Sequence, residues 1–165
     1  MIRPRREEDL ERCVALLRRV HEVDRYPVVW PPDTVAWLAG RDPLAAWVAE
    51  KDERLVGHLS LHGTDDTRAR PEWLEALGVG VEGLAVVSRF FVSPELRGRG
   101  IGGALITRAE RHAAAERRRL ALDVAEHNQD AIGFYERRGW RQVGSAELAL
   151  SVEPWRLDVL LFVLS

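Results

Sequence analysis

The sequence predicts an α/β fold in which a mixed central sheet of about six or seven strands is flanked by about four helices. Short apolar, β-favouring runs alternate along the chain with segments whose apolar residues recur at helical spacing. The length of 165 residues suits one domain with a sizeable core, and we find no internal repeat or low-complexity linker. We therefore expect residues 1–165 to form a single domain.

The composition argues against several classes of protein. With 46% hydrophobic residues, 30% charged residues and a net charge of −2, the chain lacks the basic excess that predicts a nucleic-acid partner. No apolar run reaches the roughly 18 residues of a membrane helix, and the N-terminal residues lack the apolar region of a signal peptide. Cys13 is the only cysteine, which excludes a disulfide framework or a cysteine-based zinc site within one chain. We expect a cytoplasmic protein with no metal and no membrane partner.

The first half of the chain predicts two helices and a β-hairpin. Cys13 lies on the apolar stripe of the first helix, so we expect it in the core rather than as a nucleophile. Gly40 ends the second, shorter helix. The expected elements are a short strand at 2–3, helices at 8–21 and 34–39, hairpin strands at 45–50 and 55–61, and a helical turn from residue 71 within a polar insertion at 64–80.

Two pairs of side chains in this half have alternative interpretations. Tyr26 and Trp30 lie on a proline-stiffened segment, where aromatic rings either line a substrate pocket or cover the core. His58 and His62 share one face of a predicted strand, but a spacing of four residues separates them by roughly 13 Å. That distance is too long for two ligands of one metal ion, so we expect no metal site there.

The second half predicts alternating strands and helices. Asn128 stands where the N-cap of a short helix belongs, and Gly139 follows the last turn of that helix. The C-terminal run is apolar enough for the centre of a sheet or for an interface, which leaves a homodimer open. The expected elements are strands at 84–92 and 120–124, helices at about 101–118 and 129–138, a strand each or one bent pair at 140–143 and 148–152, and a strand at 155–164.

The stretch FFVSPELRGRGIGGA, residues 90–104, predicts an anion site. A β-favouring run ends at Ser93, and four glycines then crowd into six positions where a helix begins. Glycine permits a positive φ and close approach of a ligand, while a helix start offers unpaired N–H groups and the positive end of a dipole. With the guanidinium groups of Arg97 and Arg99, this pattern favours a phosphate or pyrophosphate. The alternative is a loop that uses glycine only for a tight turn.

A dinucleotide fingerprint is a weaker interpretation of the same loop. Gly98, Gly100 and Gly103 satisfy G-x-G-x-x-G, and Asp123 lies 20 residues further on. Five residues, Ser93 to Arg97, separate the strand from the first glycine, whereas in the dinucleotide fold that glycine follows the strand almost at once. Too few residues then remain for a doubly wound sheet.

A second signature follows the first in the expected order. Residues 92–105, VSPELRGRGIGGAL, resemble the acetyl-CoA loop of the GNAT superfamily of N-acetyltransferases, whose pattern is Arg/Gln-x-x-Gly-x-Gly/Ala. The resemblance continues through Asn128, Ala131, Phe134-Tyr135 and Gly139-Trp140, which match the family's next element. It implies the GNAT acyl-CoA N-acyltransferase fold and acetyl-CoA, or coenzyme A, as cosubstrate.

The resemblance also implies roles for individual residues in binding the cofactor. The end of the motif strand pairs its backbone with the pantetheine arm, and a strand amide, that of Phe90, polarises the thioester carbonyl. Backbone amides of the glycine loop hold the pyrophosphate. Asn128 hydrogen-bonds the cofactor, a role compatible with that of a plain N-cap. The expected cofactor-binding residues are Phe90, Phe91, Val92, Arg97, Gly98, Arg99, Gly100, Ile101, Gly102, Gly103, Asn128 and Tyr135.

Three side chains are candidates for proton transfer. Tyr135 is the expected general acid, because a phenol stays protonated at neutral pH and can protonate the leaving thiolate; the alternative is a core tyrosine. Some family members place a glutamate inside the motif strand, but the corresponding residues 85–88 here contain no acid. Asp123 and Glu82 are then the candidate bases, with a water chain or a salt-bridged carboxylate as the alternatives.

These expectations combine into an acetyl-CoA-dependent N-acetyltransferase. We expect direct attack of a primary amine on the thioester within a ternary complex, because no nucleophile for an acetyl-enzyme is evident. A small-molecule amine is the expected acceptor, with a protein N-terminus or lysine as the alternative. From a different class of protein, a non-catalytic acyl-CoA-binding sensor would use the same loop.

Overall fold

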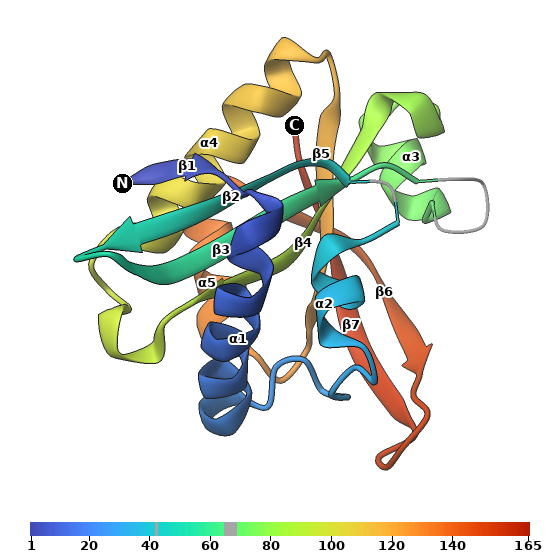
Figure 1. The fold of residues 1–165 in the computed structure, drawn as a ribbon. Coiled ribbons are helices and arrows are strands. Elements are labelled where there is room, and N and C mark those ends of the chain that lie inside the picture. Colours follow the sequence, from blue (N-terminus) through green and yellow to red (C-terminus); the bar gives the residue numbers. More distant parts are fainter. Residues whose placement is uncertain (42, 65–68) are drawn as a thin grey trace. The chain divides into compact units, whose positions relative to one another are not determined.

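The structure is a computed structural model that describes residues 1–41, 43–64 and 69–165, and it confirms the predicted α/β class with a mixed sheet (Figure 1). Its seven strands pair in the order β1-β2-β3-β4-β5-β7-β6. The strands are β1 Ile2–Pro4, β2 Pro43–Lys51, β3 Arg54–His62, β4 Leu84–Val92, β5 Arg119–Ala125, β6 Arg141–Ala149 and β7 Arg156–Leu164. The α-helices are α1 Leu10–Asp24, α2 Thr34–Ala39, α3 Pro71–Leu77, α4 Ile101–Ala115 and α5 Gln129–Arg137, and the 3-10 helices are η1 Glu7–Asp9, η2 Val81–Gly83 and η3 Pro94–Leu96.

The chain divides into two compact units. Unit 1 contains residues 1–62 and 87–112, and unit 2 contains residues 63–86 and 113–165. Both β4 and α4 therefore contribute residues to each unit. Among the described residues, every helix is too short or too polar to cross a membrane.

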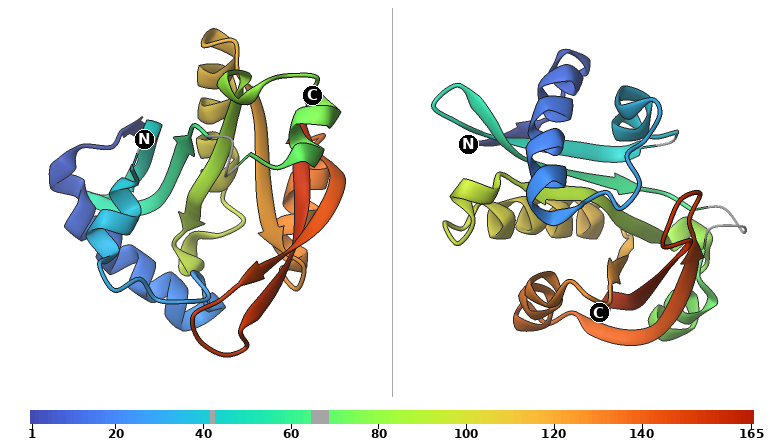
Figure 2. Two further views of the ribbon diagram at one scale, coloured as in Figure 1. Left: turned by 90° about the vertical axis from the view of Figure 1, so that its right-hand side faces the viewer. Right: turned by 90° about the horizontal axis from the view of Figure 1, so that it is seen from below.

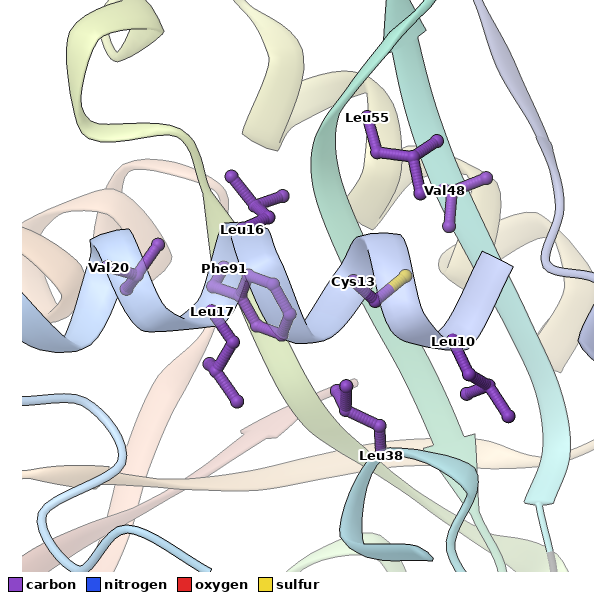
Figure 3. Close-up of a cluster of buried hydrophobic side chains, with 9 residues drawn as sticks. All are labelled: Leu10, Cys13, Leu16, Leu17, Val20, Leu38, Val48, Leu55 and Phe91. Atoms are coloured by element: carbon purple, nitrogen blue, oxygen red, sulfur yellow. The ribbon is translucent and has the colours of Figure 1, made fainter. Parts of the chain in front are cut away.

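Unit 1 has an antiparallel β1-β2-β3 arrangement with α1 and α2 packed onto it. The apolar stripe of α1 points inward, as its periodicity predicts. Cys13 is fully buried on that stripe, and burial raises the pKa of its thiol to about 12, which keeps it protonated and inert. The core cluster consists of Leu10, Cys13, Leu16, Leu17, Val20, Leu38, Val48, Leu55 and Phe91 (Figure 3).

A buried ion pair anchors the first strand of unit 1 to its first helix. Arg3 donates from two guanidinium nitrogens to both carboxylate oxygens of Asp9, at 2.7 and 2.8 Å. The backbone N–H of Arg6 donates to the same carboxylate at 2.7 Å. The Arg3 hydrogen bond, aided by that of Arg6, lowers the pKa of Asp9 to about 2. Asp9 is 1% exposed, so its charge depends on these donors.

Unit 2 is built on a parallel pair and two antiparallel pairs. Its residues of β4 pair in parallel with β5, and β7 lies between β5 and β6 (Figure 2). The apolar C-terminal run thus lies inside the sheet, one of its two predicted locations. The hydrophobic core of this unit combines Trp73, Leu77, Leu84, Ala121, Val159, Leu161 and Val163.

Two elements of unit 2 differ from the sequence prediction. The expected pair of strands at 140–143 and 148–152 is one strand, β6, whose register shifts between Gln142 and Gly144. Helix α4 ends at Ala115 instead of residue 118, and Arg117 takes a left-handed φ of 57°. The helical turn predicted from residue 71 is confirmed as helix α3, Pro71–Leu77, in which Trp73 and Leu77 bury their side chains in the core. Residues 65–68 of the predicted insertion lie outside the described residues.

Candidate active site

The loop between β4 and α4 has the backbone conformation that the glycines predict. After η3, Gly98 has φ 74° and Gly100 has φ 84°, a region that residues with a Cβ rarely adopt. The first bond that closes α4 runs from the N–H of Ala104 to the carbonyl of Gly100. A Cβ added at Gly98 or Gly100 would meet nothing within 4 Å, so backbone conformation and not crowding requires glycine. The space beside Gly98 and Gly100, where a Cβ would stand, is open.

The two loop arginines are exposed, and Arg97 already has an anionic partner. Its Nη1 donates to Asp24 Oδ1 at 3.0 Å, and its Nη2 pairs with the other oxygen of the same carboxylate. The Arg97 side chain is 44% exposed, so water screens this pair and a phosphate can replace the carboxylate. Sequence reasoning missed Asp24, because no pattern links it to a residue 73 positions away.

Buried polar side chains contact the backbone of β4 near its end. Arg89 has a left-handed φ of 46°, and its carbonyl lies 2.6 Å from His58 Nδ1. His58 Nε2 lies 2.9 Å from Arg5 Nη1, and the imidazole stacks on Phe91 with ring centroids 5.2 Å apart. Burial lowers the pKa of His58 to about 3, against the opposing effect of the Arg89 carbonyl. The ring is therefore neutral at physiological pH.

His58 and His62 contact different polar groups. The His62 Nε2 lies 2.9 Å from Ser60 Oγ, which donates to the carbonyl of Ser88 at 3.0 Å, whereas His58 bonds to other groups. In the described parts of the chain, no cluster of three or more His, Cys, Asp or Glu side chains could hold a metal ion.

In unit 2, Asn128 and Tyr135 lie at opposite ends of the same helix. Asn128 caps α5 as predicted, its side-chain oxygen accepting from the N–H of Ala131 at 3.2 Å. Tyr135 is 8% exposed and packs against Trp140 and Phe162, with ring centroids 5.7 and 6.4 Å away. Each candidate thus has a structural role in addition to the chemical role that the resemblance implies.

The two candidate bases are not brought together. Glu82 is exposed in η2, just before β4, whereas Asp123 is exposed on β5, which runs parallel to β4. Because Leu84 pairs with Arg119, Asp123 lies four residues beyond that level, about 13 Å along the strand. Surrounding protein atoms displace water from Asp123 and raise its pKa even though the residue is exposed on β5, and the charge of Arg70 opposes this effect.

The proline-rich segment between α1 and α2 covers the core. Tyr26 and Trp30 are partly buried and pack against the unit 1 cluster, which is the covering role of their two predicted alternatives. Two aromatic rings in this region also attract cations of the chain. Arg18 lies 5.2 Å from the centroid of Trp30, and Arg89 lies 4.8 Å from that of Trp37.

The predicted site residues thus form two groups. Unit 1 contains the strand end and the phosphate loop, residues 90–103, whereas unit 2 contains the α5 pair and the two candidate bases. A loop of glycines between a strand and a helix N-terminus, together with a capped α5, matches both signatures of the resemblance.

A family model described as the acetyltransferase (GNAT) family matches residues 10–140. This range covers well over half of the chain and includes both signatures. The chain therefore belongs to the GNAT family of acetyltransferases, as the resemblance predicted.

Individual relatives add detail. The chain is 33% identical over 107 residues to an uncharacterized N-acetyltransferase of Methanocaldococcus jannaschii; the match covers 64% of this chain and only 43% of that protein. It is 27% identical to the peptidyl-lysine N-acetyltransferase YjaB of Salmonella typhimurium, over 98% of this chain and 97% of that protein. The crystal structure of Arabidopsis thaliana NAA60 with acetyl-CoA shares the fold, with a TM-score of 0.74 at 24% identity over 99% of this chain and 97% of the other.

Proposed function

We propose that this protein transfers the acetyl group of acetyl-CoA to a primary amine. The observation that carries the proposal is the loop at residues 97–103, where positive φ values at Gly98 and Gly100 lead into the N-terminus of the 15-residue helix α4. Backbone N–H groups at a helix start bind a pyrophosphate, and Arg97 and Arg99 add positive charge. Membership of the GNAT family supports the choice of coenzyme A over other diphosphates.

The transfer is a direct attack within a ternary complex. The amine nitrogen forms a bond to the thioester carbonyl carbon, the carbon–sulfur bond breaks, and the coenzyme A thiolate leaves with the electron pair. We assign the N–H of Phe90 to the carbonyl oxygen, where it stabilises the negative charge that develops. Tyr135 protonates the departing thiolate, because its phenol keeps its proton at neutral pH.

The amine must lose a proton before it attacks. Asp123 is the better of the two candidate bases, because its raised pKa brings the carboxylate closer to the pH at which it must accept a proton. Glu82 is the alternative base, and water can carry the proton between the amine and either carboxylate. We keep Cys13 out of the chemistry, since its buried thiol stays protonated.

A small-molecule amine is our proposed acceptor. A protein lysine is a second candidate, supported by the nearly full-length likeness to a peptidyl-lysine acetyltransferase. We also propose a cytoplasmic location, since the single cysteine suits a reducing compartment.

An acetylation assay tests this proposal. The purified protein is incubated with acetyl-CoA and either a panel of small amines or lysine peptides, and release of free thiol is measured together with acceptor mass. We expect acceptor-dependent thiol release and a gain of one acetyl group. Binding of acetyl-CoA without transfer to any acceptor would favour the non-catalytic sensor instead.

A further inference from the structure

Arg89 lies within β4 and has a left-handed backbone conformation immediately before the strand end that is expected to bind the thioester. Its φ of 46° is a left-handed value, which is unfavourable for a residue other than glycine. Such a conformation costs about 1 to 3 kcal/mol and persists only where the surroundings hold it. The groups that hold Arg89 in this conformation therefore help to fix the geometry of the strand end.

The hydrogen bonds of His58 have only one consistent arrangement. A guanidinium can only donate, so Arg5 Nη1 donates to His58 Nε2, which must carry the lone pair. The proton of the neutral ring is then on Nδ1, which donates to the Arg89 carbonyl at 2.6 Å. Arg5 is itself positioned, because the same nitrogen donates to the carbonyl of Leu38 at 2.8 Å. A chain of donors thus runs from Arg5 through His58 to the backbone of β4.

The Arg89 carbonyl and the Phe90 N–H belong to one planar peptide group. In a trans peptide the carbonyl and the N–H point in opposite directions, so fixing one fixes the other. The neighbouring peptide is held in the same way, since Ser60 Oγ donates to the Ser88 carbonyl at 3.0 Å. The Arg89 side chain adds a further tie, because its Nε donates to the Trp37 carbonyl at 2.9 Å.

We propose that His58 is a positioning residue for acetyl transfer: it holds the Arg89–Phe90 peptide so that the Phe90 N–H points at the thioester oxygen. This inference rests on the proposed function, because it assigns a residue that aims the oxyanion donor. The phosphate loop binds the far end of coenzyme A, so the position of His58 affects the rate of transfer and not the capture of the cofactor. Arg5 acts through His58, because its hydrogen bond holds the imidazole in the tautomer that protonates Nδ1.

Two substitutions separate this role from simple packing. His58→Asn keeps a side-chain N–H close to the position of Nδ1, whereas His58→Leu fills similar space and removes the donor. We expect His58→Leu to lower kcat by about tenfold to a hundredfold while the KM for acetyl-CoA stays within about twofold. His58→Asn should recover most of kcat. Leu59→Ala is the control, because it destabilises the fold by truncating a fully buried side chain next to His58 while it keeps the imidazole, and it should leave kcat unchanged.

A direct readout follows the peptide itself. The amide chemical shift of Phe90 is compared between the acetyl-CoA complex and the coenzyme A complex, which differ by the thioester carbonyl. We expect a difference in the wild-type protein and in His58→Asn, and its loss in His58→Leu. The inference is overturned if His58→Leu retains wild-type kcat, if the asparagine variant is as slow as the leucine variant, or if the shift difference is the same in all three proteins.

This readout also separates the inference from the proposed function. If wild-type protein acetylates no amine, the proposed transfer fails, and the Phe90 shift alone then decides whether His58 aims the peptide. If the wild-type protein transfers acetyl groups while the His58 variants behave alike, the proposed function stands and His58 has no positioning role.

Discussion

The phosphate loop of unit 1 and helix α5 of unit 2 carry the two family signatures, yet they are built in different ways. The loop works through its backbone, with Gly98 and Gly100 at positive φ and nothing near a Cβ added to either. In α5, each predicted functional side chain also has a structural role, Asn128 as a cap and Tyr135 as a packed ring. Substitutions in the loop should therefore change ligand binding at little cost to the core, whereas those in α5 need variants that preserve packing.

Tyr135→Phe gives the largest expected effect and tests the α5 side of this contrast. Phenylalanine keeps the ring that packs against Trp140 and Phe162, so stability should change little. Loss of the hydroxyl should reduce kcat about a hundredfold if it protonates the thiolate, with acetyl-CoA affinity nearly intact. Steady-state kinetics and urea unfolding of both proteins measure this. Equal kcat values would remove Tyr135 from the mechanism and leave it a core residue.

Gly100→Ala tests the loop side. A Cβ at φ 84° strains the backbone by about 1 to 2 kcal/mol, and the loop must distort to relieve it. We expect the KM for acetyl-CoA to rise about tenfold, which is the change that this strain energy can produce. Gly78→Ala is a matched control, because Gly78 also has a positive φ of 64° with open space around it, at the end of α3. If both variants bind acetyl-CoA alike, the loop does not hold the pyrophosphate.

The buried His58 of unit 1 predicts that the free energy of unfolding depends on pH. Its pKa is about 3 in the fold and 6.5 when unfolded, so between these values the unfolded chain binds more protons. Stability should fall as the pH falls through this range, by at most about 1.4 kcal/mol per pH unit for one proton. The charged or titratable groups around the ring are Arg5, Arg89 and His62.

Urea unfolding of the wild-type protein and His58→Asn at pH 6.5 and 4.5 measures this dependence. The difference in unfolding free energy between the two pH values should be smaller in the variant, because asparagine does not titrate. Asp9 does not interfere, since its pKa of about 2 against 3.8 unfolded confines its loss of stability to lower pH. Identical differences in the two proteins would contradict the neutral, buried state of His58.

Two substitutions at Asn128 distinguish its role as a helix cap from a role in binding the cofactor. Asn128→Ala should cost about 1 kcal/mol of stability through loss of the cap, whereas Asn128→Ser should retain most of it. If Asn128 also binds the cofactor, both variants should raise the KM for acetyl-CoA, since neither carries an amide. A serine variant with wild-type KM and stability would leave Asn128 with the role of a cap alone.

The smallest expected effect concerns the ion pair between Asp24, at the end of α1, and Arg97 of the phosphate loop. Asp24→Asn removes a carboxylate that competes with phosphate for Arg97, so acetyl-CoA should bind about two- to fivefold more tightly at low salt. Glu22→Gln is the control, because it removes one negative charge from the same end of α1 and leaves the pair in place. Weaker binding in Asp24→Asn would mean that Asp24 holds Arg97 ready for the ligand instead of competing with it.

The parts of the fold that the sequence predicts well are those with local signals. The cap at Asn128, Gly40 at the end of α2 and the β-hairpin each depend on residues a few positions apart, and the structure confirms all three. The single strand β6 was missed, because its register shift is set by pairing with β7 and leaves no local pattern. The helical turn at residue 71 was predicted from local residues, whereas the burial of Trp73 in a core formed by distant strands leaves no local pattern.

The candidate site shows the same limit. Glycine spacing predicts the loop and its positive φ values, because conformational freedom is a property of the residue itself. The sequence does not predict the contacts of His58, because its partners Arg5 and Arg89 lie 53 and 31 residues away. Its role depends on tertiary contacts that no spacing within one sequence can indicate.

The route of the chain through the two units has a consequence for synthesis. Every residue of unit 1 lies within the first 112 positions, whereas unit 2 needs the chain through β7. A nascent protein can therefore assemble the strand end, the His58 contacts and the phosphate loop while the C-terminal third is still being translated. In unit 2, β5 then pairs in parallel with residues 84–86 of β4, and β7 pairs with β5 in turn.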